Sequence, residues 1–134
     1  MGYGQQPKRC SNAEMASFVR RAEPFNNAKG SCYGRLLGAI YVVFSYGEHF
    51  PIYIQDELGR WWGNMDKYST TTTRHQRCAN PVARWRYDDA SGRRVEDPSA
   101  PRLVDTDTMR EIVRAGGVGA AATRKLERAI EKAA

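Results

Sequence analysis

The sequence has no long apolar run, and its longest one, residues 36–44, is interrupted by Gly38. A membrane-spanning helix needs roughly 18–20 consecutive apolar residues, so no membrane span is expected. The first ten residues also lack the apolar core segment that a secretory signal peptide carries. Together these two absences predict an intracellular protein with no membrane partner.

Cysteine is scarce as well, with three residues at wide spacings, Cys10, Cys32 and Cys78. An odd number of distant cysteines argues against a disulfide framework and fits reduced thiols. A zinc site would need close pairs of ligands, yet there is no Cys-x-x-Cys, and the nearest pair is His75 with Cys78. We therefore expect neither a metal site nor a cofactor, and we interpret the cysteines as small buried side chains.

Motifs of established catalytic chemistry are missing too. The chain has no paired-carboxylate metal motif, no nucleophile elbow and no phosphate-binding glycine loop, because residues 34–38 lack the Lys-Ser/Thr that would have to follow. We therefore expect a protein that is not an enzyme. A weaker alternative is a metal-free nuclease. The side chains that could form its site are His49, His75, Arg74, Tyr68, Glu48 and Asp66.

What the chain does have is positive charge, with 21 Lys and Arg against 15 Asp and Glu and a formal net charge of +6 over 134 residues. A chain of this length suits one domain with at most a small appendage. Cations outnumber acids in residues 1–35 and again in 61–83, whereas acids prevail in 36–60. Positive segments on both sides of the central strands predict a moderate electropositive surface that suits a polyanion.

Local patterns predict an α+β fold, in which an N-terminal helix packs on a three- to four-stranded antiparallel sheet, followed by a short helix and a C-terminal helical hairpin. A capping box at Ser11 and Glu14 begins the first helix, and β-branched and aromatic residues mark the strands. Ser69 or Thr70 caps the short helix, although the run of threonines also suits a strand. The expected elements are a helix at 12–22, an extended segment with a bend at 32–40, strands at 41–46, 52–54 and 60–64, a helix at 69–79, a hairpin or exposed excursion at 82–96, and helices at 106–115 and 118–133.

These elements divide the chain into three parts. Residues 1–10, rich in Gly, Gln and Pro, are expected to be a flexible tail. Residues 11–97 form the α+β domain, and residues 98–134 comprise a linker and the C-terminal helical appendage. Within the strongest strand, alternation predicts that Tyr41 and Ser45 point to one face and that Phe44 and Tyr46 point to the other.

One motif stands out in the second half of the domain. Residues 68–76 read Tyr-Ser-Thr-Thr-Thr-Thr-Arg-His-Gln. They fit the pattern Tyr-Ser, a variable residue, two Thr, a variable residue, a basic residue and His-Gln. With the Pro24-Phe25 pair and the strand at 41–46, the segment 12–77 resembles a small domain of unknown function that is widespread in proteins of tailed bacteriophages. The resemblance implies a phage or prophage source and leaves the mechanism open.

Cationic, hydroxyl and aromatic side chains form the candidate binding set. A helix N-terminus with threonine hydroxyls and nearby arginines suits phosphate, and a tryptophan beside arginine can stack on a base or anchor a protein. The structural alternative is that the polar residues cap the helix and that helices cover the aromatics. The candidate residues are Arg20, Arg21, Trp61, Trp62, Lys67, Thr71, Arg74, His75 and Arg77.

These features predict a non-catalytic accessory binding protein, encoded by a phage and acting in the cytoplasm of a bacterial host. Its expected partner is nucleic acid or a host nucleoprotein complex. From source and size, one possible role is inhibition of host defence, as an anti-CRISPR protein does. The alternative is a protein–protein interaction module that binds a host or phage protein through exposed aromatics and the C-terminal helices.

Overall fold

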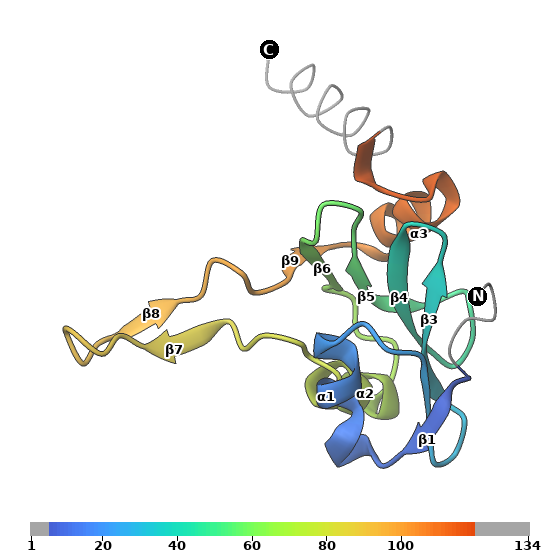
Figure 1. The fold of residues 1–134 in the computed structure, drawn as a ribbon, viewed down its shortest axis with the longest axis horizontal. Helices are drawn as coiled ribbons and strands as arrows, with labels where there is room; N and C mark the ends of the chain where they lie inside the picture. The colour runs from blue at the N-terminus through green and yellow to red at the C-terminus, as the bar shows by residue number, and fades with distance from the viewer. Residues whose placement is uncertain (1–5, 120–134) are drawn as a thin grey trace.

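The structure, a computed structural model, describes residues 6–119 and is dominated by β-strands (Figure 1). The strands are β1 (Lys8–Cys10), β2 (Phe25–Asn27), β3 (Cys32–Leu37), β4 (Ile40–Ser45), β5 (Pro51–Gln55), β6 (Trp61–Asn64), β7 (Trp85–Tyr87), β8 (Arg94–Glu96) and β9 (Arg102–Val104). Seven of them form one sheet in the order β1-β2-β3-β4-β5-β6-β9, and β7 pairs with β8 in a separate hairpin. Neighbours from β2 to β6 are antiparallel, whereas the two outer pairs are parallel.

Three short α-helices cover the two faces of the sheet. They are α1 (Met15–Arg20), which follows a 3-10 turn at Asn12–Glu14, α2 (Thr70–Cys78) and α3 (Thr106–Ala115). On one face α1 and the end of α2 pack on the sheet, through Met15, Val19 and Ala79, against Phe25, Tyr41, Val43 and Ile52. On the other face α3 packs on the sheet, through Met109 and Ile112, against Ile40, Val42, Phe44 and Ile54. No helix in residues 6–119 is long and apolar enough to cross a membrane.

The central strand β4 is buried along its whole length, as expected for a strand covered on both faces. Its residues alternate between the two core clusters as the sequence predicts, with Tyr41 and Val43 on the α1 side and Val42 and Phe44 on the α3 side. Tyr46 departs from the prediction. Its φ of 59° takes it out of the strand conformation, and its ring lies 5.6 Å from that of His75 on the α2 side.

Three predicted helices are present, and the one predicted at 106–115 is observed with those bounds as α3. The threonine-rich stretch is a helix capped by Ser69, whose Oγ accepts a hydrogen bond from the Thr72 N–H at 3.1 Å. The helix expected over 12–22 is shorter, because it begins as a 3-10 turn and its last α-helical residue is Arg20. Ala22 then adopts a φ of 52°, which reverses the chain before Pro24.

The expected fold class, a helix on a three- to four-stranded sheet with a C-terminal helical hairpin, is wrong, because the protein is mostly β. The missed strands β1, β2 and β9 have three residues each, too few to show a period of two. They are held by backbone pairing with a neighbour, as when β9 lies in parallel beside β6. The second helix of the expected hairpin, at 118–133, lies almost entirely outside the described residues.

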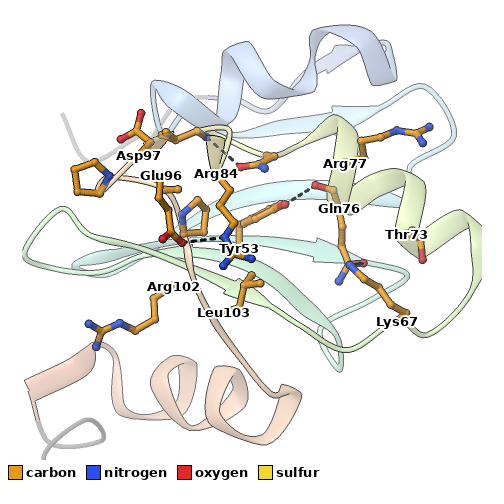
Figure 2. Close-up of a pocket in the computed structure, with 15 residues that line it drawn as sticks. Tyr53, Lys67, Thr73, Gln76, Arg77, Arg84, Glu96, Asp97, Arg102 and Leu103 are labelled. Carbon is orange, nitrogen blue, oxygen red and sulfur yellow. Dashed lines mark hydrogen bonds and ion pairs between the residues drawn. The ribbon is translucent and has the colours of Figure 1, made fainter. Parts of the chain in front are cut away.

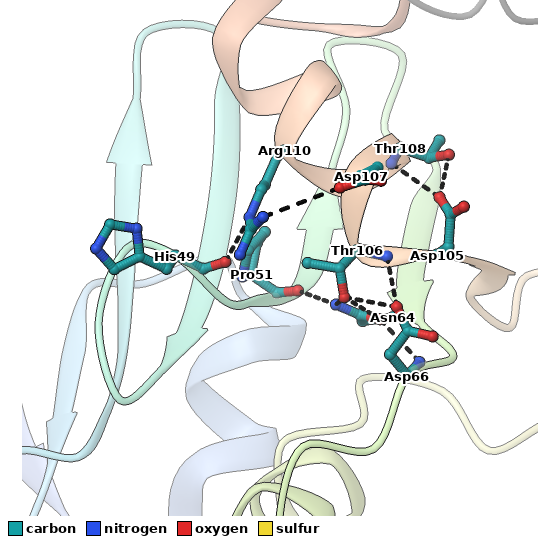
Figure 3. A network of polar contacts seen from close by, with 9 residues as sticks. All are labelled: His49, Pro51, Asn64, Asp66, Asp105, Thr106, Asp107, Thr108 and Arg110. Carbon is teal, nitrogen blue, oxygen red and sulfur yellow. Dashed lines mark hydrogen bonds and ion pairs between the residues drawn. The ribbon is translucent and has the colours of Figure 1, made fainter.

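The N-terminus of α3 is tied to the end of β6 by side-chain hydrogen bonds (Figure 3). Thr106 donates from N–H and from Oγ1 to the Asp66 carboxylate, at 2.8 and 2.7 Å, and the Asn64 Nδ2 donates to Thr106 Oγ1 and to the Pro51 carbonyl. Asp105 caps the helix through the Thr108 N–H. These contacts hold α3 on one face of the sheet, and α2 packs on the opposite face.

Candidate nucleic-acid interface

Helix α2 turns one face toward the sheet and the other toward solvent. Thr72, His75 and Gln76 are buried, whereas Thr71, Thr73, Arg74 and Arg77 are exposed. The spacing of three and four residues places each set on one side of the helix. The motif at residues 68–76 therefore contains residues that hold α2 against the sheet and residues that face solvent.

His75 is one of the buried residues that hold α2 against the sheet. Its Nδ1 lies 2.8 Å from Ser45 Oγ, its Nε2 lies 3.4 Å from Ser31 Oγ, and only 1% of the residue is exposed. Burial lowers the pKa of His75, and the positive charge of Arg74 lowers it further, so the imidazole is neutral at pH 7. The structure thus places this predicted binding residue beneath the surface that a ligand would reach.

Gln76 orders the segment that precedes α2. Its Nε2 donates to the carbonyls of Asn64 and Asp66, at 3.0 and 2.9 Å, and its Oε1 accepts from Lys67 Nζ at 3.1 Å. The Tyr53 hydroxyl in turn donates to the Gln76 carbonyl. These bonds fix Lys67 beside the exposed face of α2.

Three cations meet on this face, and we call Lys67, Arg74 and Arg77 the α2 cation cluster. All three are exposed, and none is in an ion pair with a carboxylate of residues 6–119. They line a shallow depression of about 350 Å³, together with Tyr68, Ser69, Thr70 and Thr73. Uncompensated cations beside hydroxyl groups make this surface suitable for an anion. The candidate Thr71 lies on the same helix, in a second depression that Arg74 also lines.

A larger cavity adjoins the cluster, and we call it the basic groove. It has a volume of about 750 Å³ and lies between α2, β9 and the base of the β7–β8 hairpin (Figure 2). Lys67 and Arg77 line it as well as the first depression, so the two are continuous. Arg84 and Arg102 also line it, with the acids Glu96 and Asp97, but Arg84 is paired with Glu96 at 2.9 Å and the Arg102 guanidinium lies 5.6 Å from the centroid of the Trp62 ring. Neither Arg84 nor Arg102 is among the residues predicted from the sequence, because only the tertiary fold brings them to the cavity beside α2.

The remaining candidates lie elsewhere. Arg20 is exposed at the end of α1, and the neighbouring Arg21 forms an ion pair with Glu23 at 2.9 Å. Arg20 is the last residue of α1 and Arg21 follows it, and neither lines the groove.

The tryptophan doublet points to opposite faces of the sheet, as neighbouring residues of a strand do. Trp61 is half-buried and packs edge-on against Tyr41, while Trp62 is 8% exposed and donates from Nε1 to Asp56 at 2.9 Å. Burial alone would raise the pKa of Asp56, but hydrogen bonds from Trp62, Arg60 and Leu58 together hold that pKa below its ordinary value. Trp62 therefore serves the core, and the most exposed aromatics of the described chain are Tyr68, Tyr87, Tyr46 and Trp85.

Comparisons with protein-family models, with curated proteins and with solved structures find no match for this chain. The phage source thus stays a prediction, and the function is inferred below from the site.

Proposed function

We propose that the protein is a non-catalytic nucleic-acid-binding protein whose α2 cation cluster and basic groove hold the sugar–phosphate backbone. The observation that carries this proposal is the position of Lys67, Arg74 and Arg77, which share one exposed surface without carboxylate partners among the described residues. A polyanion would supply the missing negative charge along that surface.

The chemistry of the side chains supports phosphate over an isolated carboxylate. Arginine presents a planar fork that matches the oxygens of a phosphate, and a lysine beside it acts as a point charge. The cluster continues into the groove through Lys67 and Arg77, which line both, so an extended chain of phosphates has several cations to follow. If the partner is a host nucleoprotein complex, the same surface would bind its exposed nucleic acid and inhibit the complex.

Fluorescence anisotropy with labelled 20-nucleotide DNA and RNA and a 20-bp duplex tests the proposal, at salt concentrations from about 50 to 200 mM. We expect binding that weakens steeply with salt, and a double variant Arg74→Ala/Arg77→Ala that weakens it for every sequence. Each lost phosphate contact should reduce the log–log salt slope by about 1 on duplex DNA.

The matched control is Arg110→Ala/Arg114→Ala on α3, because it removes the same charge from a helix on the opposite face of the sheet. We expect this control to keep nearly all of the affinity. Absence of binding at low salt, or equal weakening by both double variants, would contradict the proposal.

A further inference from the structure

The β7–β8 hairpin projects away from the main sheet as a two-stranded arm (Figure 1). Trp85 is 42% exposed and Tyr87 is 74% exposed. A two-stranded ribbon with no packed face is marginally stable in water, and large aromatic side chains are rarely left exposed together. The exposed aromatic side chains therefore indicate that the arm is a binding surface and does not serve only as a connection.

The aromatic side chains lie on one face of the arm. Trp85 and Tyr87 are two residues apart in β7, so both point to the same side, and their cross-strand partners Glu96 and Arg94 share that side. The Arg94 guanidinium lies 4.7 Å from the centroid of the Trp85 ring, and the Arg84 guanidinium lies 5.3 Å from it. We call Trp85, Tyr87 and Arg94 the arm face.

Charge along the arm differs between its base and its outer half. At the base Arg84 pairs with Glu96, and Arg86 lies 3.8 Å from Asp97. Arg94, in the arm face, has no ion pair with a carboxylate of residues 6–119. The acids Asp88 and Asp89 lie in the turn beyond Tyr87, where Asp88 accepts from the Ser91 N–H. The arm face thus combines two aromatic rings with an unneutralised guanidinium.

The arm face begins where the basic groove ends. Arg84 lines the groove and also lies over the Trp85 ring, so it connects the two surfaces. A strand whose phosphates follow Lys67 and Arg77 into the groove would reach Arg84 and Trp85 next. This continuity ties the aromatic rings to the same ligand as the cations.

The distance between the two rings determines whether they can bind paired or unpaired nucleotides. Residues two apart in a β-strand are separated by about 7 Å, roughly twice the 3.4 Å between successive stacked nucleotides of one duplex strand. Paired bases are held in the stack and cannot splay onto both rings, whereas unpaired bases can. We propose that the arm face stacks unpaired bases, so that the ligand of the site is single-stranded nucleic acid. This inference rests on the proposed function and names its substrate class.

Anisotropy with the full chain tests the inference, using the 20-nucleotide single strands and the 20-bp duplex as probes. Stacking on an aromatic side chain is lost when the ring is removed, so Trp85→Ala and Tyr87→Ala should each weaken single-strand binding about tenfold. Duplex binding should change by less than about twofold, and Trp85→Phe should restore most of the single-strand affinity. Leu58→Ala, another exposed apolar residue, is the control and should leave both affinities unchanged.

The outcomes separate the two proposals. If Arg74→Ala/Arg77→Ala weakens binding while Trp85→Ala and Tyr87→Ala do not, the arm inference is overturned and the proposed function stands. Tighter binding of duplex than of single strands, or equal loss of both in the arm variants, also overturns the inference. A concentration-dependent dimer that Trp85→Ala abolishes would assign the arm face to a second copy and overturn it too. Failure of the unmodified protein to bind any probe would remove both proposals.

Discussion

The Oγ atom of Ser45 lies 2.8 Å from Nδ1 of His75, which joins the last residue of β4 to the middle of α2, 30 residues further on. A neutral imidazole with its proton on Nδ1 satisfies this contact, because Ser45 gives its own proton to Thr72 Oγ1 at 3.3 Å. With this tautomer, Ser31 Oγ donates to Nε2 at 3.4 Å on the other side of the ring. This buried network holds α2 against the sheet and so places the α2 cation cluster.

We expect His75→Ala to lower the free energy of unfolding by about 2 kcal/mol, because it leaves a cavity and removes the partner of a buried hydroxyl. Urea denaturation at pH 7 measures the change. Thr71→Ala, on the exposed face of the same helix, is the control and should stay within about 0.5 kcal/mol of the unmodified protein. Equal effects of the two substitutions would show that the network does not support the fold.

Stability should also fall as the pH drops from 7 toward 5. The folded protein holds the pKa of His75 below its ordinary value of 6.5, so in this range the unfolded chain binds more protons than the folded one. The slope from this single group is at most about 1.4 kcal/mol per pH unit. Urea titrations at a series of pH values measure it, and His75→Gln should flatten the dependence. An unchanged slope in that variant would mean that another group titrates.

Gly34 in β3 has no room for a side chain, because a Cβ would lie 2.2 Å from the Tyr41 hydroxyl and 2.7 Å from Phe25 Cε1. The Tyr41 hydroxyl is itself fixed, since it donates to the Glu23 carbonyl at 2.7 Å. Gly34→Ala should therefore destabilise the protein by about 1–3 kcal/mol through overpacking. Thermal melting measures the loss of stability, which reports on the close packing of β3 against Phe25 and Tyr41. A melting temperature within about 1 °C of the unmodified protein would contradict it.

Arg21 and Arg74 are both exposed arginines, but the structure predicts different roles for them in binding. Arg21 is paired with Glu23 just after α1, whereas Arg74 has no such partner among residues 6–119. Arg74→Ala should weaken nucleic-acid binding several-fold and reduce the log–log salt slope by about 1, while Arg21→Ala should change the affinity less than about twofold. Anisotropy at two salt concentrations measures both. Equal losses would indicate that net charge alone governs binding.

Much of the local structure could be predicted because its signals lie close together in the chain. The β-branched and aromatic run of β4 indicates a buried strand, and the Ser69 hydroxyl, three residues before the Thr72 N–H, indicates where α2 begins. Helical spacing also places Arg74 and Arg77 on one side of α2, but it does not decide which side of the helix packs on the sheet.

The sheet edges could not be predicted in this way. Strands of three residues such as β1 and β9 carry no periodic signal, and their pairing depends on neighbours that are distant in sequence. Tyr46 shows the same limit, because a single positive φ moves its ring to the face opposite the one that alternation predicts.

The amino-acid sequence by itself determined the central strand, the capped threonine-rich helix and the excess of positive charge, because each depends on residues a few positions apart. Only the tertiary structure decided that Arg77, Arg84 and Arg102 line one groove and that His75 lies beneath the surface instead of on it. The physical reason is that backbone pairing and core packing join residues that no local pattern relates.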